Sequence, residues 1–283
     1  MINYLIMTML GCTANLTSPE VVTAQDSSSA ELIIEDTGNN ETSEDYNQPG
    51  EYEITIESNT ASVTNCSNMN YSVYSPIGHS NPPVVILGHG FARGPDTMTG
   101  WAEHLSSWGI EVLLPSLCHY NIFAGVDHEM NGQNMKELGE LHGSSNIIYA
   151  GHSAGGLAAI IASSMDENAS GVLGLDTTDT ENVPGVPDFI GQQYANTIHG
   201  IGFYIHGESS SCNSENNGLD LFEMMDEFYI IKVDGADHCD FEFPTDVICE
   251  MNCENTNTDR SDEHIRTSII TSGTSAILLL SGI

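Results

Sequence analysis

Basic residues are scarce in this sequence. Its 283 residues include five Lys and Arg against 40 Asp and Glu, which gives a formal net charge of −35 at pH 7. Contacts to phosphate groups need clustered Lys and Arg side chains, so the composition excludes a nucleic-acid-binding protein. The acidic surface is expected to repel anionic membranes and polymers and to stay soluble at high salt. It favours a saline habitat, with compositional drift in a secreted protein as the alternative.

Long apolar runs are missing as well, and the N-terminal one is short. Residues 4–10 are fewer than the roughly 20 residues that span a bilayer, but they match the apolar region of a signal peptide. The run ends at Leu10-Gly11-Cys12, which resembles the lipobox of bacterial lipoproteins. We therefore expect residues 1–12 to be a signal peptide and Cys12 to be the lipidated residue. A buried N-terminal strand with a chance Cys is the alternative.

Aromatic residues are nearly absent from residues 13–50, which are rich in Ser, Thr, Asn, Asp and Glu. Such a segment buries too little apolar surface to fold, so we expect an acidic, disordered tether. The whole chain is 40% hydrophobic and 16% charged, which allows one ordinary core. The sequence thus predicts a single folded domain over residues 51–283.

Cysteines are few but even in number once Cys12 is set aside. An even number in an exported chain indicates disulfides, and six cysteines allow 15 pairings. Cys249 with Cys253 is the most local candidate pair. A zinc site built from His238 and the last three cysteines is the alternative, but no C-x-x-C knuckle is present, so we predict no metal. The six are Cys66, Cys118, Cys212, Cys239, Cys249 and Cys253.

From residue 51 onward, short β-branched runs alternate with longer helical stretches, which is typical of an α/β sheet. The first two strands alternate in polarity like antiparallel edge strands, whereas later strands are continuously apolar and therefore buried on both faces. The predicted strands cover about 51–57, 70–75, 84–88, 110–114, 146–150, 171–176, 201–206 and 228–234. The predicted helices lie near 97–108, 131–142, 154–165, 218–227 and 262–280. Residues 127–132, a cluster of His and carboxylates, are interpreted as a helix N-terminal cap, with metal binding as the weaker alternative.

A nucleophile motif follows the strand at 146–150. Gly151-His152-Ser153-Ala154-Gly155 has the pattern G-x-S-x-G between a strand and a helix. The turn is so tight that side chains at 151 and 155 would collide with neighbouring backbone. The nucleophile is therefore forced outward at the start of the helix, and Ser153 is the candidate; a Gly-rich packing turn is the alternative.

A serine nucleophile needs a His to accept its proton and a carboxylate to orient that His. His238 follows the last predicted strand, where its loop would face Ser153, whereas His264 belongs to the final helix. Asp176 ends the next buried strand after the nucleophile and is the preferred acid. Glu208, which follows the strand at 201–206, and then Asp179 are the alternatives. A strand-end carboxylate that caps a turn also remains an open interpretation of Asp176.

Acyl transfer also needs hydrogen-bond donors for the oxyanion, each contributing on the order of 3 kcal/mol of transition-state stabilisation. The strand at 84–88 ends in His89-Gly90-Phe91, so we expect the backbone N–H groups of Phe91 and Ala154 to form this oxyanion hole. The Phe91 ring either lines the acyl site or packs near Trp101.

This combination resembles the α/β-hydrolase superfamily over nearly all of residues 51–283. His89-Gly90-Phe91 followed by Trp101 resembles the lidless cutinase-like polyester hydrolases and the chlorophyllase-like esterases. Gly174-Leu175-Asp176 resembles the acid-bearing strand end of chlorophyllases and pancreatic-type lipases. The expected fold is therefore the α/β-hydrolase fold, in which the eight predicted strands form a mostly parallel sheet flanked by helices. The longest connection after the nucleophile, residues 176–201, contains two Pro and is expected to be an ordered loop, which leaves no room for a large lid.

The resemblance also implies carboxylic-ester hydrolysis without any cofactor. We expect an exported serine esterase, secreted or held in the cell envelope by a lipid on Cys12, that acts as a monomer on neutral esters or polymer surfaces. The runner-up is a lipase or polyester hydrolase. From another class, a non-catalytic hydrolase-fold binding protein of the envelope is the alternative.

Overall fold

The computed structural model describes residues 45–121, 125–181, 186–198, 200–253 and 262–283. Within them lies one eight-stranded sheet in the order β1-β2-β4-β3-β7-β8-β9-β10. Within this sheet, β4, β3, β7, β8, β9 and β10 run parallel to one another, whereas β2 is antiparallel to both β1 and β4. The predicted fold class is therefore confirmed, including the count of eight strands and the antiparallel pairing of the first two. Of these two only β1 lies at the edge of the sheet, because β2 pairs with both β1 and β4.

The strand bounds follow the apolar runs closely in the parallel part of the sheet. Val84–Gly88 is buried at every position, as is Ile147–His152, because helices cover both faces there. The strands of the large sheet are β1 Ile54–Val63, β2 Cys66–Pro76, β3 Val84–Gly88, β4 Glu111–Pro115, β7 Ile147–His152, β8 Ala169–Leu175, β9 Ile201–His206 and β10 Phe228–Lys232. A separate two-stranded sheet pairs β5 Tyr120–Asn121 with β6 Gly125–Val126.

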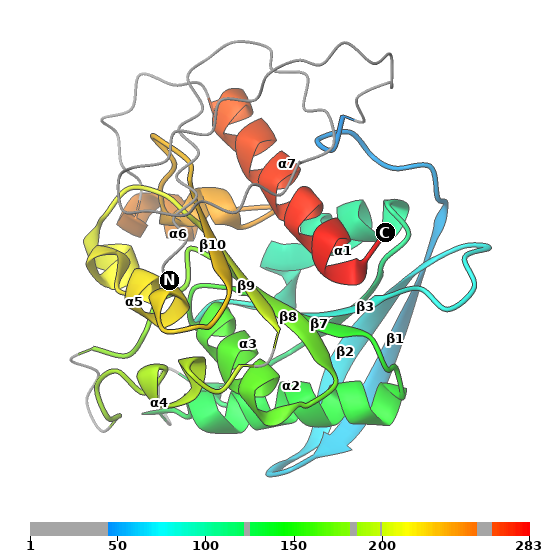
Figure 1. The fold of residues 1–283 in the computed structure, drawn as a ribbon, viewed down its shortest axis with the longest axis horizontal. Helices are drawn as coiled ribbons and strands as arrows, with labels where there is room; N and C mark the ends of the chain where they lie inside the picture. The colour runs from blue at the N-terminus through cyan, green and yellow to red at the C-terminus, as the bar shows by residue number, and fades with distance from the viewer. Residues whose placement is uncertain (1–44, 122–124, 182–185, 199, 254–261) are drawn as a thin grey trace.

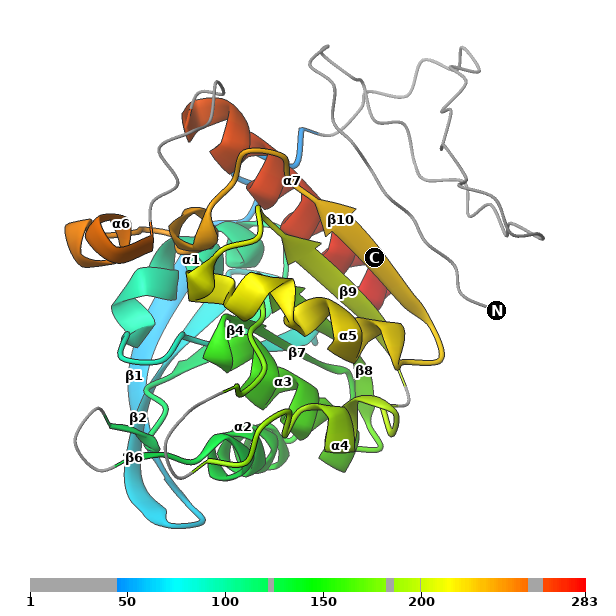
Figure 2. The ribbon, with the colours of Figure 1, turned by 90° about the vertical axis from the view of Figure 1, so that its left-hand side faces the viewer.

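Helices pack on both faces of the sheet (Figures 1 and 2). They are α1 Thr99–Ser107, α2 His128–His142, α3 Ala154–Met165, α4 Gln192–Ala195, α5 Gly218–Glu223, α6 Val247–Cys253 and α7 Asp262–Ser281, with short 3-10 helices η1 Pro95–Met98, η2 Ser211–Asn216 and η3 His238–Phe241. Residues of α2, α3 and α5 form one buried apolar cluster with the sheet, and residues of α1 and α7 form the other. The molecule is thus a three-layer sandwich.

The structure corrects several sequence-based bounds. β1 and β2 were expected at 51–57 and 70–75, but they form a longer hairpin whose turn places Asn65 at a φ of 55°. The added residues are mostly exposed and polar, so no apolar pattern marked them. Two short elements, α4 and α6, were not predicted, and α5 ends before residue 227.

The folded domain begins before residue 51. The carbonyl oxygens of Tyr46 and Gln48 accept hydrogen bonds at 2.9 and 3.0 Å from the rings of His104 and Trp108. The Gly50 N–H donates to Ser107 Oγ at 2.8 Å. Residues 45–50, which we had assigned to the tether, therefore pack against α1 and the residue that follows it.

Three disulfides join the six cysteines of the body. The pairs are Cys66–Cys118, Cys212–Cys253 and Cys239–Cys249. The expected pair of Cys249 with Cys253 is therefore wrong. Both residues lie one helical turn apart on α6, and their side chains reach two different segments instead of each other.

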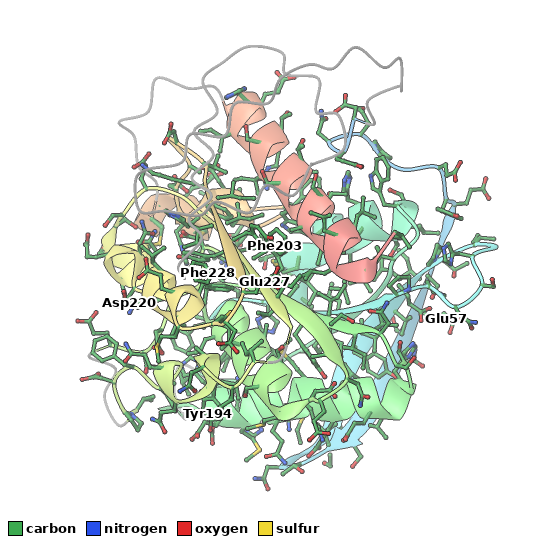
Figure 3. All side chains as sticks on the ribbon, viewed as in Figure 1. Glu57, Tyr194, Phe203, Asp220, Glu227 and Phe228 are labelled. Atoms are coloured by element: carbon green, nitrogen blue, oxygen red, sulfur yellow. A yellow bond between two sulfur atoms is a disulfide. The ribbon has the colours of Figure 1, made fainter. Side chains whose placement is uncertain are left out.

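Acidic side chains lie on several sides of the molecule. Glu57 in β1, Asp220 in α5 and Glu227 before β10 are exposed and lie in separate parts of the view (Figure 3). Among the described residues, no helix is both long and apolar enough to cross a bilayer. The predicted signal peptide and Cys12 lie outside the described residues.

Candidate active site

Ser153 lies on the sharp turn between β7 and α3. Its φ of 56° and ψ of −125° place a non-glycine residue in a rarely occupied backbone region. A Cβ added at Gly151 would lie 2.4 Å from the Gly155 carbonyl, and one at Gly155 would lie 2.5 Å from the His89 oxygen. Only glycine fits at either position, as the motif predicts, and the hydroxyl is held at the start of α3.

Ser153, His238 and Asp176 form one hydrogen-bonded chain. His238 Nδ1 lies 2.6 Å from Asp176 Oδ2, and its Nε2 lies 3.0 Å from Ser153 Oγ. Because a carboxylate only accepts, Nδ1–H must donate to Asp176, which leaves Nε2 as the acceptor for the serine hydroxyl. Asp176 and His238 are buried. This is the arrangement that lets a histidine take a proton from a serine.

Asp176 is held rigidly at the end of β8. Its own backbone has a φ of 44°, and its N–H donates to the Ile205 oxygen at 2.7 Å. The carboxylate oxygen Oδ1 accepts from the Gly207 N–H at 3.1 Å. The Ser153 N–H donates to the Leu175 oxygen at 3.0 Å, so the turn that carries the serine is joined directly to the strand that carries the acid.

The two alternative acids point elsewhere. Glu208 forms an ion pair with Lys232 at 2.8 Å and accepts from the Gly235 N–H at 2.9 Å. Asp179 accepts from the Thr180 and Gly191 N–H groups at 2.7 and 2.9 Å, and burial raises the pKa of its carboxyl. Asp176 is the carboxylate that contacts His238.

The candidate oxyanion loop passes beside Ser153. A Cβ added at Gly90 would lie 3.4 Å from the Ser153 Cβ, so the backbone leading to Phe91 runs along the nucleophile. His89 fixes this loop: its Nδ1–H donates to the Gly90 oxygen at 2.9 Å and its Nε2 accepts from the Leu117 N–H at 3.1 Å. Both bonds require a neutral ring, and burial lowers the pKa of His89.

The predicted oxyanion donors are the N–H groups of Phe91 and Ala154. Among the backbone hydrogen bonds of turns, loops and caps in the described residues, neither N–H group is a donor, as a role in binding an oxyanion requires. The Phe91 ring is 41% exposed and meets Tyr120 edge-on, with ring centroids 6.2 Å apart. Tyr120 in turn donates to the Ala154 oxygen. Phe91 is therefore an exposed apolar residue on the loop that passes Ser153, and the ring contact it makes is with Tyr120.

Comparison with known proteins gives information on the fold of the chain. No protein-family model matches the chain, and no curated protein matches it either. Among solved structures, dienelactone hydrolase from Anabaena variabilis ATCC 29413 is similar with a TM-score of 0.57 and 13% identity, over 80% of this chain and 97% of that one. The α/β hydrolase GrgF from Penicillium sp. sh18 gives a TM-score of 0.55 and 12% identity, over 71% and 96%.

The chain has the α/β-hydrolase fold. In this fold the nucleophile turn joins a central strand to a helix, as β7 and α3 do here. At such low identity the likeness shows the fold alone, so the chemistry is argued from the residues of this chain.

Two contacts that the sequence did not reveal tie the loops of this hydrolase fold together. His152 Nε2–H donates to the His238 oxygen at 2.9 Å, and burial lowers the pKa of His152, which keeps its ring neutral. Arg93, just after the oxyanion loop, forms a two-pronged ion pair with the buried Glu242, both contacts at 2.6 Å. Glu242 lies four residues after His238. No local pattern could have paired residues about 150 positions apart.

The metal alternatives find little support in the geometry. The sulfurs of Cys239, Cys249 and Cys253 lie within 4.8 Å of one another, but all three belong to disulfides and offer no thiolate. Asp127 caps α2 by accepting from the Met130 N–H at 2.9 Å, as predicted for this cluster. His128 is buried beside it, and burial lowers its pKa to about 4.

Proposed function

We propose that the protein is a serine carboxylic-ester hydrolase. The observation that carries this proposal is the hydrogen-bonded chain from Ser153 through His238 to Asp176, at the carboxyl ends of β7 and β8. The α/β-hydrolase fold supports a hydrolase in general, and the residues favour an ester as substrate. The rival of another class is a hydrolase-fold protein that binds without catalysis.

The proposed reaction uses only side chains and backbone of this chain. Ser153 Oγ attacks the ester carbonyl carbon while His238 Nε2 takes the hydroxyl proton and Asp176 stabilises the resulting imidazolium. The N–H groups of Phe91 and Ala154 hold the oxyanion. The alcohol leaves with the proton from His238, and water then attacks the acyl-serine with His238 as base, which releases the carboxylic acid and regenerates Ser153.

Charge favours a neutral substrate. A formal charge of −35 repels anionic esters, especially at low ionic strength where the field extends furthest. Phe91 offers the bound molecule an exposed apolar surface next to the serine. We therefore infer that uncharged esters are the substrates.

A lipase or polyester hydrolase is the second candidate, and one surface feature favours it. The outward side chains of α6, Val247, Ile248 and Met251, are 62%, 63% and 81% exposed. α6 is joined by Cys249 to the segment that carries His238. An apolar surface fixed near the proposed site suits a substrate presented at an insoluble phase. The strand-end position of Asp176 favours the chlorophyllase-like arrangement of the acid over the cutinase-like one.

We also propose that the protein is exported and acts as a monomer. Three disulfides support export, since such bonds persist in oxidising compartments. Lipidation of Cys12, as expected from the sequence, would anchor the protein to the cell envelope. Metabolic labelling with a fatty-acid analogue, compared between the wild type and Cys12→Ala, tests this lipidation. Labelling that persists in the variant would contradict the anchor.

The function is tested by hydrolysis of p-nitrophenyl esters from acetate to palmitate by the whole chain, at low and high NaCl, beside Ser153→Ala. We expect turnover that is lost in the variant, with the optimal acyl length and emulsion activity separating esterase from lipase. Turnover that persists in Ser153→Ala would contradict the proposed nucleophile, and no turnover with any ester would contradict the proposal and favour the binding protein.

A further inference from the structure

The buried side chain of Asn213 lies against the carboxylate of Asp176. Asn213 belongs to η2, far from the acid in sequence, and none of its surface is exposed. Its Nδ2 lies 3.2 Å from Oδ2 and 3.3 Å from Oδ1 of Asp176, and 2.8 Å from the Glu208 carbonyl oxygen. Since the amide nitrogen carries two hydrogens, it can donate to the carboxylate and to this carbonyl together.

The orientation of this amide is set by its other end. Asn213 Oδ1 accepts from the Ser210 N–H at 2.9 Å and from the Asn216 N–H at 3.1 Å. Two backbone donors require an oxygen at this position, so the nitrogen must face Asp176. The amide therefore cannot flip without losing its hydrogen bonds at both ends.

The surrounding backbone is strained. Ser214, Glu215 and Asn216 have φ values of 47°, 56° and 63°, three consecutive non-glycine residues in the left-handed region. This conformation is unfavourable for residues other than glycine, so the surrounding contacts must hold the loop in this form. Strain of this kind concentrates where a side chain has to be aimed at a functional group.

A single helix fixes this loop and the histidine loop together. Cys212, which precedes Asn213, is bonded to Cys253 of α6, and Cys239, which follows His238, is bonded to Cys249 of the same helix. The donor to Asp176 and the ring that Asp176 orients are thus each one residue from a covalent link to a seven-residue helix.

We propose that Asn213 is a positioning residue for the triad, held in register with His238 by α6. It fixes the plane of the Asp176 carboxylate, so that Oδ2 faces His238 Nδ1 and the ring keeps its Nε2 on Ser153. This inference rests on the proposed serine hydrolase and adds a fourth side chain to its machinery. Without Asn213, the Gly207 N–H at Oδ1 would be left as the donor opposite His238, and a less constrained carboxylate would let the His238 ring tilt away from the serine. Misplacement by about 1 Å costs up to about 100-fold in rate.

The test compares kcat and KM of whole-chain variants on a p-nitrophenyl ester. Asn213→Ala is expected to lower kcat at least about tenfold while KM changes by less than about threefold, because orientation and not ground-state binding is lost. Asn217→Ala is the matched control, because the Asn217 side chain forms its hydrogen bonds with the backbone of Asp179 in the same region and not with Asp176. A similar kcat loss in this control would overturn the inference.

Asn213→Asp separates positioning from a structural role. This variant keeps the shape and the oxygen that accepts from Ser210 and Asn216, but its carboxyl group cannot donate to Asp176 while it is ionised. A kcat close to that of the wild type at a pH where the introduced carboxyl group is ionised would contradict the inference. We expect Asn213→Asp to be at least as impaired as Asn213→Ala.

A double-mutant cycle completes the test and remains valid if the variants lose some stability. In an Asp176→Ala background Asn213 has no carboxylate to orient, so adding Asn213→Ala should change the rate of Ser153 phosphonylation by less than about threefold. Equal losses of the phosphonylation rate with and without the Asp176 carboxylate would overturn the inference.

If Ser153→Ala leaves turnover intact, the proposed function itself fails. Serine-dependent turnover with unaffected Asn213 variants removes only this inference.

Discussion

At the scale of single residues, the proposed site depends on one carboxylate. Asp176 contacts His238, whereas Glu208 is engaged with Lys232 and the Gly235 N–H. Asp176→Asn should lower kcat by about four orders of magnitude because it favours the wrong histidine tautomer, with little change in melting temperature. Glu208→Gln should change kcat only slightly. Steady-state kinetics of both variants check this, and the reverse order of effects would move the acid to Glu208.

His128 predicts a pH dependence of stability. Burial lowers its pKa from 6.5 to about 4, so the unfolded chain binds a proton between these values that the folded chain does not. Stability from this residue is fully present above about pH 6.5 and is lost as the pH falls toward 4, by about 2 kcal/mol at pH 5.

Urea unfolding from pH 7 to pH 5 tests this prediction with His128→Gln as the reference. The wild type should lose about 2 kcal/mol more than the variant over this range, since the variant shares every other titrating group. Parallel curves for the two proteins would mean that His128 is protonated in the folded state.

Residue roles could be predicted where local pattern dictates geometry. Ser153 was found because its turn demands glycine on both sides, and His238 because it follows the last strand of the sheet. Asn213, His152 and the pair of Arg93 with Glu242 were not found. Their partners come from distant segments, and no spacing in the sequence relates them.

At the scale of elements, the long periodic ones were predicted and the short ones were not. The parallel strands and α3 carry apolar runs that burial on two faces requires. α6 has only seven residues and exposes most of its apolar side chains, so no core-facing pattern marks it. Its position is fixed by disulfides, whose partners the sequence could not specify.

The disulfides on α6 make a prediction about stability. Removing Cys239–Cys249 and Cys212–Cys253 by Cys249→Ser with Cys253→Ser should lower the free energy of unfolding by about 2–4 kcal/mol per bond, because the unfolded chain gains freedom. Urea titration measures this loss. Peptide mapping of the unreduced wild type is the companion control: a Cys249–Cys253 peptide, or an unchanged urea midpoint, would contradict the pairing.

At the scale of the whole molecule, the charge balance sets the response to salt. A formal charge of −35 on 283 residues makes the folded state repel itself. The melting temperature should rise steeply as NaCl goes from about 0.01 to 0.15 M, where the Debye length falls from about 30 to 8 Å, and less steeply beyond. Thermal melts across this series check it. A flat response at low salt, with a rise only at molar NaCl, would point to solute exclusion instead of screening.

The architecture of the folded domain was largely predictable from the sequence, but the residue at which the domain begins was not. Eight strands and their mixed directions follow from polarity patterns, and the structure confirms them. Residues 45–50 join the body through backbone hydrogen bonds to α1 and Trp108 and through one side chain, Tyr46, whose ring meets Trp108 edge-on. Backbone contacts leave no compositional signature, so a polar segment that folds onto the surface looks like a tether.

The central claim is that Ser153 is a nucleophile activated by His238. The most direct measurement is phosphonylation of the whole chain by a fluorophosphonate, followed by digestion and mass spectrometry. The account predicts one modified residue, Ser153, with labelling slowed at least about 100-fold in His238→Ala. Labelling at another residue, no labelling of Ser153, or an equal rate in His238→Ala would contradict it.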